Sequence, residues 1–208
     1  MKRMYTLGIC SLAILLACGS ARSDDEFNRR GTFIGLGASG MISGFQGILG
    51  KADFGNTAGL NFHAGYRLNE YFAVDSVFEY GADFGRSGRT RTIGQQVITH
   101  SSSIQTAAFT VGPKLILPLG RFQPYLDGGI GFINANGNVD VENQTTGRIV
   151  GGGRTGSGFA GRFGGGIDVF VTREISLYVD NAYTIPATGP TDVYYYSFGV
   201  GGRYNFNF

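Results

Sequence analysis

The chain has 208 residues, with 17 lysines and arginines against 15 aspartates and glutamates. Loss of Lys2 and Arg3 with a targeting segment leaves 15 basic against 15 acidic residues, so charge gives no reason to expect nucleic acid as a partner. Cys10 and Cys18 both precede residue 22, which excludes a disulfide framework from the rest of the chain.

Residues 1–21 have the pattern of a secretory signal. Lys2 and Arg3 precede an apolar run from Leu7 to Ala17. This run is too short to cross a bilayer as a helix, and it suits the apolar region of a signal peptide. We therefore expect the body of the protein to be exported.

The processing of this signal stays open between two outcomes. Residues 15–18, Leu-Leu-Ala-Cys, resemble a lipobox, which would leave Cys18 lipidated, whereas small residues such as Ala21 suit an ordinary signal peptidase. In both cases we expect a short periplasmic segment at 22–30 and a single domain at 31–208.

Eight segments follow in which apolar and polar side chains alternate with a period of two, as in β-strands. Their connections alternate between long polar or glycine-rich segments and tight turns such as Asn69-Glu70. No helical periodicity of useful length appears after residue 22. Alternating long and short connections are typical of an up-and-down barrel in an outer membrane. The predicted strands are 32–42, 57–68, 71–84, 104–117, 122–134, 157–171, 175–184 and 193–208.

The last strand shows the alternation most clearly. The sequence ends on Phe208, and an apolar strand with a free edge is an aggregation hazard in a soluble protein. The hazard disappears if the strand closes a barrel and its apolar face contacts lipid. That face consists of Tyr194, Tyr196, Phe198, Val200, Gly202, Tyr204, Phe206 and Phe208.

Alternation alone does not decide which face lies outside, because a soluble barrel of lipocalin type has the same period with its apolar face inward. The signal segment, the terminal Phe208 and two groups of aromatic residues near the strand ends favour a membrane barrel. We therefore predict an all-β fold, an eight-stranded antiparallel up-and-down transmembrane β-barrel with aromatic side chains toward lipid. The aromatic groups are Tyr66, Phe72, Phe122, Tyr204, Phe206 and Phe208 at the tight turns, and Phe84, Phe132, Phe159, Tyr183 and Tyr194 at the long loops.

With this orientation, parity places ten charged residues inside the barrel. Charges in a narrow interior must be paired or hydrated, and an eight-stranded barrel is only wide enough for its own side chains. We predict a polar plug, with a narrow channel for small solutes as the alternative. The predicted lumen residues are Arg67, Asp75, Glu79, Asp83, Lys114, Asp127, Arg162, Asp168, Asp180 and Arg203.

Motifs that suggest chemistry are weak. Residues 35–40 match G-x-G-x-x-G, but no helix follows to hold a pyrophosphate, so these glycines are expected to line the interior. His63 is expected on the lumen face as a hydrogen-bonded filler, and the run at 100–103, which reads as a loop, lacks the acid of a Ser–His–acid set. No cluster has metal-ligand spacing. We predict no enzymatic activity, no cofactor and no metal site.

Arg86, Arg89 and Arg91 form a basic cluster without acids in the segment 85–103, which reads as an external loop. Binding residues of barrels commonly lie on such loops. The hypothesis is that these arginines meet anionic groups, such as lipopolysaccharide phosphates or acidic glycans on another surface. The alternative is a mobile, solvated loop with no ligand.

Three short motifs are similar to the OmpA-like outer-membrane β-barrel family, the eight-stranded type that includes OmpX-like proteins. They are Gly65-Tyr66-Arg67-Leu68-Asn69, Pro124-Tyr125 with Gly129-Ile130-Gly131, and the ending Tyr204-Asn205-Phe206-Asn207-Phe208. The ending resembles the signal read by the barrel-assembly machinery, although Arg203 stands where that signal usually has glycine.

The resemblance implies a bacterial outer-membrane protein, surrounded by lipid and lipopolysaccharide, with the assembly machinery as a partner of Tyr204, Phe206 and Phe208. It also implies a structural or surface-interaction role of the adhesion type. A small-solute channel is the second function class, and a lipid-modifying enzyme is a distant third.

Overall fold

The computed structural model describes residue 27 and residues 30–44, 55–93, 96–143 and 148–207, of which 86–102, 138–154 and 207 are described by their backbone. Nine strands lie within these ranges. No helix in the described ranges is long and apolar enough to cross a membrane. The strands are β1 (Gly31–Ser43), β2 (Thr57–Arg67), β3 (Phe72–Gly81), β4 (Arg86–Ile93), β5 (Gln96–Ile116), β6 (Phe122–Asn143), β7 (Arg148–Phe170), β8 (Ile175–Pro186) and β9 (Tyr195–Asn207).

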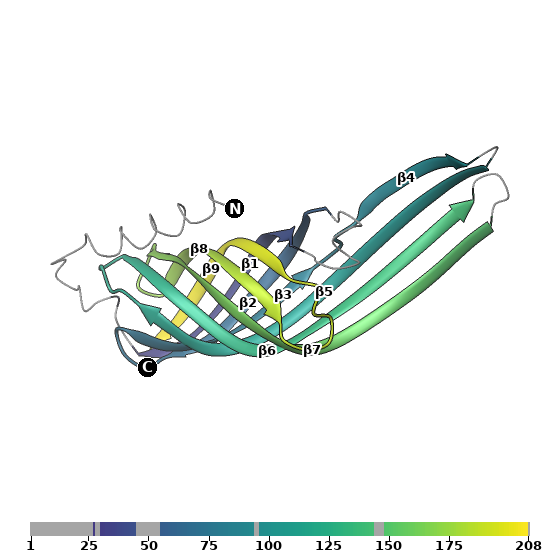
Figure 1. The fold of residues 1–208 in the computed structure, drawn as a ribbon. Helices are drawn as coiled ribbons and strands as arrows, with labels where there is room; N and C mark the ends of the chain where they lie inside the picture. The colour runs from purple at the N-terminus through teal and green to yellow at the C-terminus, as the bar shows by residue number, and fades with distance from the viewer. Residues whose placement is uncertain (1–26, 28–29, 45–54, 94–95, 144–147, 208) are drawn as a thin grey trace, which may run out of the picture.

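Eight of these strands form a closed ring. Each pairs antiparallel with its neighbours in the order β1, β2, β3, β5, β6, β7, β8, β9, and β9 pairs back with β1 (Figure 1). Closure leaves the barrel wall without a free strand edge, which a hydrocarbon environment demands. The prediction of an all-β, eight-stranded, antiparallel up-and-down barrel is confirmed.

The orientation of the strands also matches the prediction. Phe198 and Val200 are 50% and 49% exposed on the outside of β9, whereas Arg162 is 5% exposed inside the barrel. In β8 buried and exposed residues alternate along the whole strand. The apolar residues therefore face the membrane and the charged residues face the lumen.

The predicted orientation is wrong for two residues that follow β3. Counting by parity put Asp83 in the lumen and Phe84 at the membrane, but Asp83 is exposed and Phe84 is 0% exposed. The strand ends at Gly81, and a period of two holds only while the backbone stays extended in the sheet. The backbone N–H of Phe84 bonds to the Ile104 carbonyl oxygen at 2.8 Å, which anchors this residue against the inside of β5.

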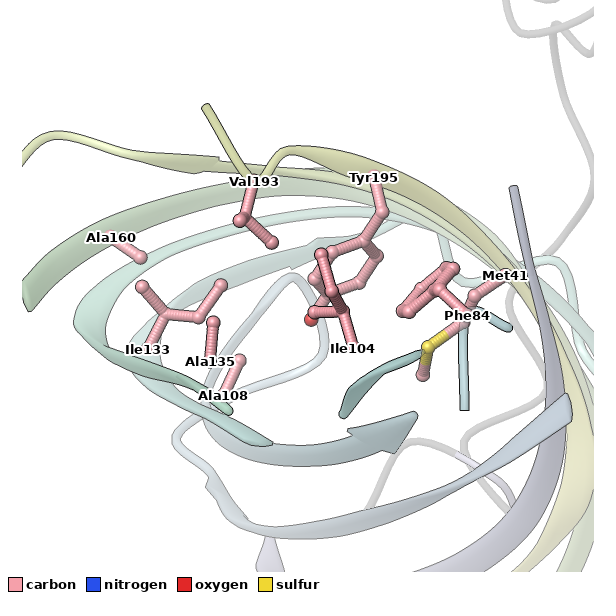
Figure 2. Packing of buried hydrophobic residues seen from close by; sticks show 9 residues of the cluster. All are labelled: Met41, Phe84, Ile104, Ala108, Ile133, Ala135, Ala160, Val193 and Tyr195. Atoms are coloured by element: carbon pink, nitrogen blue, oxygen red, sulfur yellow. The ribbon is translucent and has the colours of Figure 1, made fainter. Parts of the chain in front are cut away.

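Phe84 belongs to an apolar cluster that closes the lumen at the end opposite the tight turns. Figure 2 shows its side chains pointing toward one another from several strands and from the segment before β9. Tyr195 and Met41, 0% and 1% exposed, are among its most buried members. The cluster is Met41, Phe84, Ile104, Ala108, Ile133, Ala135, Ala160, Val193 and Tyr195.

Beyond this cluster, a sheet continues away from the barrel (Figure 1). It consists of β4 with the outer parts of β5, β6 and β7, which pair as far as Ile93, Gln96, Asn143 and Arg148. We call this four-stranded extension the distal sheet. The interpretation of 85–103 and 135–156 as irregular loops is therefore wrong for most of their length. The strands of the distal sheet were not predicted because neither face of this sheet contacts lipid. Without lipid on one side, the strands show no alternation of apolar and polar residues.

Candidate functional site

Nine of the ten predicted lumen residues lie in the interior, where their exposed fractions run from 1% to 8%. Asp83 is the exception. Buried charges are tolerated when they are paired and hydrogen-bonded, and the barrel brings acids and bases from different strands into contact. The nine are Arg67, Asp75, Glu79, Lys114, Asp127, Arg162, Asp168, Asp180 and Arg203.

Arg162 on β7 is the centre of one cluster. Its guanidinium bonds to Asp127 on the neighbouring strand β6. Its Nη2 also lies 3.3 Å from Asp180 Oδ2 on β8, and its Nε lies 3.7 Å from Glu79 Oε2. Glu79 comes from β3, which is not adjacent to β7 in the ring. The Arg162 side chain therefore links strands across the lumen.

Asp168 on β7 is the centre of a second cluster nearer the tight turns. It accepts hydrogen bonds from Lys114 Nζ at 2.8 Å and from the Arg203 guanidinium. Lys114 Nζ also lies 3.6 Å from the centroid of the Tyr125 ring, and the Arg203 guanidinium lies 4.8 Å from that of Tyr178. These cation–π contacts solvate the two cations in a site closed to bulk water.

Glu79 is held by hydroxyl groups as well as by Arg162. Ser197 Oγ donates to Glu79 Oε1 at 2.8 Å, and Tyr195 Oη donates to Oε2 at 3.2 Å. Charge-assisted hydrogen bonds of this kind are stronger than neutral ones. Ser197 and Tyr195 lie on the polar face of the last strand, where the sequence alternation placed them.

His63 lies in the lumen as predicted, but the two carboxylates beside its ring were not predicted. Its Nδ1 lies 3.1 Å from Asp75 Oδ2 and its Nε2 lies 3.6 Å from Asp180 Oδ2. A carboxylate thus lies beside each ring nitrogen, and the imidazole links β3 to β8 across the lumen. The sequence could not reveal this arrangement, since it depends on the register of β2 against β3 and on the distance across the lumen to β8.

The expectation that the glycines of the G-x-G-x-x-G match line the interior is right for Gly35 and Gly37 and wrong for Gly40, which is exposed and pairs with the lipid-facing Phe198. Gly37 and Gly201 show what the interior glycines make room for. The two face each other on β1 and β9, and each is also paired with a larger residue, Asn61 on β2 and Tyr178 on β8. Tyr178 Oη reaches over both glycines and donates to Asn61 Oδ1 at 2.8 Å. The G-x-G-x-x-G match at 35–40 thus lies in the strand β1, where the second glycine makes room for this aromatic ring.

The lumen is also closed at the end with the tight turns. Arg67 Nη1 donates to Gln123 Oε1 at 2.8 Å and to the Phe27 carbonyl oxygen at 3.3 Å. The Phe27 ring packs against Phe170 with their centroids 5.6 Å apart. No feature of the sequence indicated that Phe27 would contact the barrel mouth.

A small cavity lies among the lumen charges between the two closed ends. Its volume is about 10 Å³, it is lined by Asp75, Thr110, Asp127 and Arg162 among others, and it has room for about one water molecule. The described residues contain no group of three or more His, Cys, Asp or Glu side chains that could hold a metal ion.

The distal sheet places the three predicted arginines on one face. Residues directly opposite in antiparallel strands share a face. Arg91 pairs with Ile98, Ile98 with Asn143, and Asn143 with Arg148, so Arg91 and Arg148 share a face across four strands. Arg86 and Arg89 are three residues apart, but a register shift between them pairs Arg86 with Ser102 and Arg89 with His100, which brings both to this face. The pairings define a set of positions that we call the cationic face: Arg86, Arg89, Arg91, His100, Arg148 and Arg154.

Acidic residues of the distal sheet lie on the opposite face. Glu142 pairs with Thr99 and Ile149, and Asp140 pairs with Ser101 and Gly151. These rows alternate with the arginine rows. The run at 100–103, which reads as a loop in the sequence, is part of β5.

The assembly-signal residues are described in part. Tyr204 and Phe206 are exposed on the lipid side of β9, with ring centroids 4.8 Å apart. Phe208 and Cys18 lie outside the described residues, so the terminal signal and the lipidation site stay predictions.

Comparison with known proteins identifies the family. A family model for the outer membrane protein beta-barrel domain matches residues 10–206. A search of curated proteins found no match. The crystal structure of Ail, the attachment invasion locus protein of Yersinia pestis, in complex with the heparin analogue sucrose octasulfate, is similar at a TM-score of 0.53 and 18% identity. This match covers 86% of the present chain and 99% of Ail.

The outer membrane protein OprG from Pseudomonas aeruginosa is similar at a TM-score of 0.53 and 14% identity, over 88% of the present chain and 99% of OprG. At these identities the two structures show a common fold. The family match covers nearly the whole sequence, and the closed barrel with its apolar exterior agrees with it. The chain belongs to the outer membrane protein beta-barrel domain family and is a protein of the bacterial outer membrane.

Proposed function

We propose that this protein is a non-conducting, non-enzymatic outer-membrane barrel whose distal sheet binds polyanionic glycans at the cell surface. The observation that carries the proposal is the segregation of charge by register. Five arginines share one face of the sheet with His100, and Asp140 and Glu142 lie on the other. A surface of one sign attracts ligands of the opposite sign and orients them as they approach.

The position of the cationic face favours a ligand beyond the lipid headgroups. The exposed aromatic pair Phe132 and Phe159, with ring centroids 4.7 Å apart, marks the outer membrane interface. From Phe132 to Asn143 the strand β6 is about 36 Å long at about 3.3 Å per residue. Strands of such barrels tilt by about 35–45°, so the row of Arg91 and Arg148 lies about 25 Å or more beyond this pair, outside the level of lipid A phosphates.

The dimensions of the face suit an extended ligand. Arg91 and Arg148 stand at the two edges of the sheet, separated by three strand spacings or about 14 Å. Arg89 and Arg91 are two residues apart on one strand, about 7 Å. A chain with repeated sulfate or carboxylate groups meets several arginines at once. Ail, which has the same fold, has been crystallised with a sulfated heparin analogue, and this supports the same class of ligand here.

The test is binding of heparin, used as the probe, to barrels refolded in detergent. The triple variant Arg86→Gln, Arg89→Gln, Arg91→Gln is expected to bind about tenfold more weakly, because three exposed charge contacts at about 0.5 kcal/mol each contribute about 1.5 kcal/mol. Wild-type binding is expected to weaken steeply as salt rises. Surface plasmon resonance at two salt concentrations measures both effects.

The matched control removes positive charge elsewhere. Arg121→Gln with Arg173→Gln changes exposed residues at the tight turns and is expected to leave binding nearly unchanged. Binding that ignores salt, or that is equal in the triple variant and the wild type, would contradict the proposal.

The non-conducting part of the proposal rests on the closed lumen. Arg162 and its carboxylate partners occupy the middle, and apolar side chains and Phe27 lie toward the two ends. In planar bilayers the purified protein is expected to give no steady conductance. Reproducible single-channel steps from refolded protein would favour the narrow channel instead.

The non-enzymatic part rests on where the two histidines lie. His63 is enclosed in the lumen between Asp75 and Asp180 and does not reach lipid. His100 shares its row with Arg89, Val141 and Val150, which supply no carboxylate for a catalytic set. Lipid A from cells that express the protein is expected to keep its acyl chains, as measured by mass spectrometry.

For biogenesis, we propose that Tyr204, Phe206 and Phe208 on the final strand serve as the signal for the barrel-assembly machinery. Lipidation of Cys18 is a separate expectation from the lipobox-like residues 15–18. Intact mass of the mature protein distinguishes an acylated Cys18 from cleavage by an ordinary signal peptidase.

A further inference from the structure

The lipid face of the barrel carries few polar side chains. Between the two aromatic belts, the described residues with non-aromatic polar side chains on this face are Ser76 and Asn181. Ser76 Oγ donates to the Ala64 carbonyl oxygen at 2.8 Å. Asn181 is exposed in the middle of β8, between Val179 and Tyr183, and makes no hydrogen bond to any described residue. Asn181 therefore presents an unpaired amide to the membrane.

An unpaired amide is costly in hydrocarbon, where no water is present to bond to it. Polar side chains inside a membrane commonly bond to a second transmembrane surface. The asparagine amide has both donors and an acceptor, so it is complementary to a second asparagine. A two-fold axis normal to the membrane would place two copies of this group face to face and satisfy both.

The surroundings of Asn181 suit close contact between two barrels. Asn181 pairs with Gly165 on β7 and with Phe198 on β9, and the next position in the row, Gly40 on β1, pairs with Phe198. A Cβ built on Gly40 has nothing within 4 Å, so the wall is flat there. Phe163 and Phe198, 68% and 50% exposed, stand beside the amide and supply apolar contact.

We propose that the outer face of β7, β8 and β9 pairs with the same face of a second copy of this chain, with Asn181 bonded to Asn181 across the two-fold axis. The interface is isologous and closes as a dimer. Its polar centre gives it a fixed alignment, because any other relative position leaves both amides unpaired.

Cysteine cross-linking in lipid vesicles tests the dimer while Asn181 is kept. Val179→Cys lies next to Asn181 on the proposed interface. Val74→Cys lies on β3, on the opposite side of the ring, and the two valines are 46% and 41% exposed. An oxidant is expected to join two Val179→Cys chains in high yield and two Val74→Cys chains at the level of random collision.

Removal of the amide gives the second measurement. Val179→Cys with Asn181→Leu is expected to lose most of the cross-linking, with the dimerisation constant roughly tenfold weaker, because two membrane hydrogen bonds are lost. Leucine suits a lipid-facing position, and the heat-modifiable shift on gels verifies that this variant folds. Cross-linking of Val179→Cys no greater than that of Val74→Cys would show that the barrel is a monomer in lipid. Strong cross-linking that is unchanged by Asn181→Leu would show that the amide does not hold the two barrels together, and either result overturns the proposal.

Discussion

Replacing Arg162 with methionine is expected to lower the free energy of unfolding of the barrel by about 3–5 kcal/mol. The substitution leaves Asp127 and Asp180 in the lumen without the cation that both contact, and Glu79 loses its nearest guanidinium. Unpaired buried carboxylates are far more costly than a missing ion pair at a surface. Urea titration in lipid vesicles, followed by the fraction of the compact band on unboiled gels, measures the loss.

Two further variants show that the loss comes from the lumen charges. Arg173→Met, in the exposed turn between β7 and β8, is expected to change stability by less than about 0.5 kcal/mol. Adding Asp127→Asn to Arg162→Met removes one of the stranded negative charges and is expected to recover part of the stability. Equal stability of Arg162→Met and the wild type would mean that the interior is hydrated enough to solvate its carboxylates.

Replacing Gly37 with valine is the second large effect that we expect. A Cβ at this position would meet Tyr178 Oη, Asn61 Oδ1 and the Val200 carbonyl oxygen. The valine therefore displaces the Tyr178 ring and breaks its hydrogen bond to Asn61. Overpacking of this kind costs about 1–3 kcal/mol, and loss of the buried hydrogen bond adds to it. The same urea titration measures the change.

Gly40 provides the matched control, because it lies on the same strand and faces lipid. Its Cβ would have nothing within 4 Å, and a β-branched side chain suits an exposed strand position. In a barrel without a partner, Gly40→Val is therefore expected to be neutral or slightly stabilising. A Gly37→Val barrel that unfolds at the wild-type urea concentration would show that Tyr178 has room to move.

The transmembrane part of the fold could be predicted from the sequence, because each strand there has lipid on one side and the lumen on the other. That environment enforces a period of two, and it placed Phe198 outside and Arg162 inside correctly. The prediction was wrong for Asp83 and Phe84, because the chain leaves the sheet after Gly81. Beyond that residue, alternate side chains no longer point to opposite sides of the barrel wall. The prediction was also wrong for the distal sheet, whose strands lie between two faces of similar polarity.

The contents of the lumen were predictable, but its pairings were not. Parity identified Asp168 and Arg203 as interior residues, yet their contact depends on the positions of β7 and β9 across the lumen. The carboxylates at both nitrogens of His63 come from β3 and β8, and no local pattern relates them. For the arginines, the common face of Arg91 and Arg148 follows from the register of four strands, which a single sequence does not specify.

The continuity of β5, β6 and β7 from the tight turns to the tip has a mechanical consequence. A load applied at the outer end pulls along these strands, so the hydrogen bonds between them are stressed in shear and share the force. They do not separate one after another, as they do when a hairpin is pulled open from its ends. The outer end of the distal sheet is therefore joined to the barrel wall by a stiff ribbon, and a ligand bound there as proposed is expected to dissociate before the ribbon unfolds.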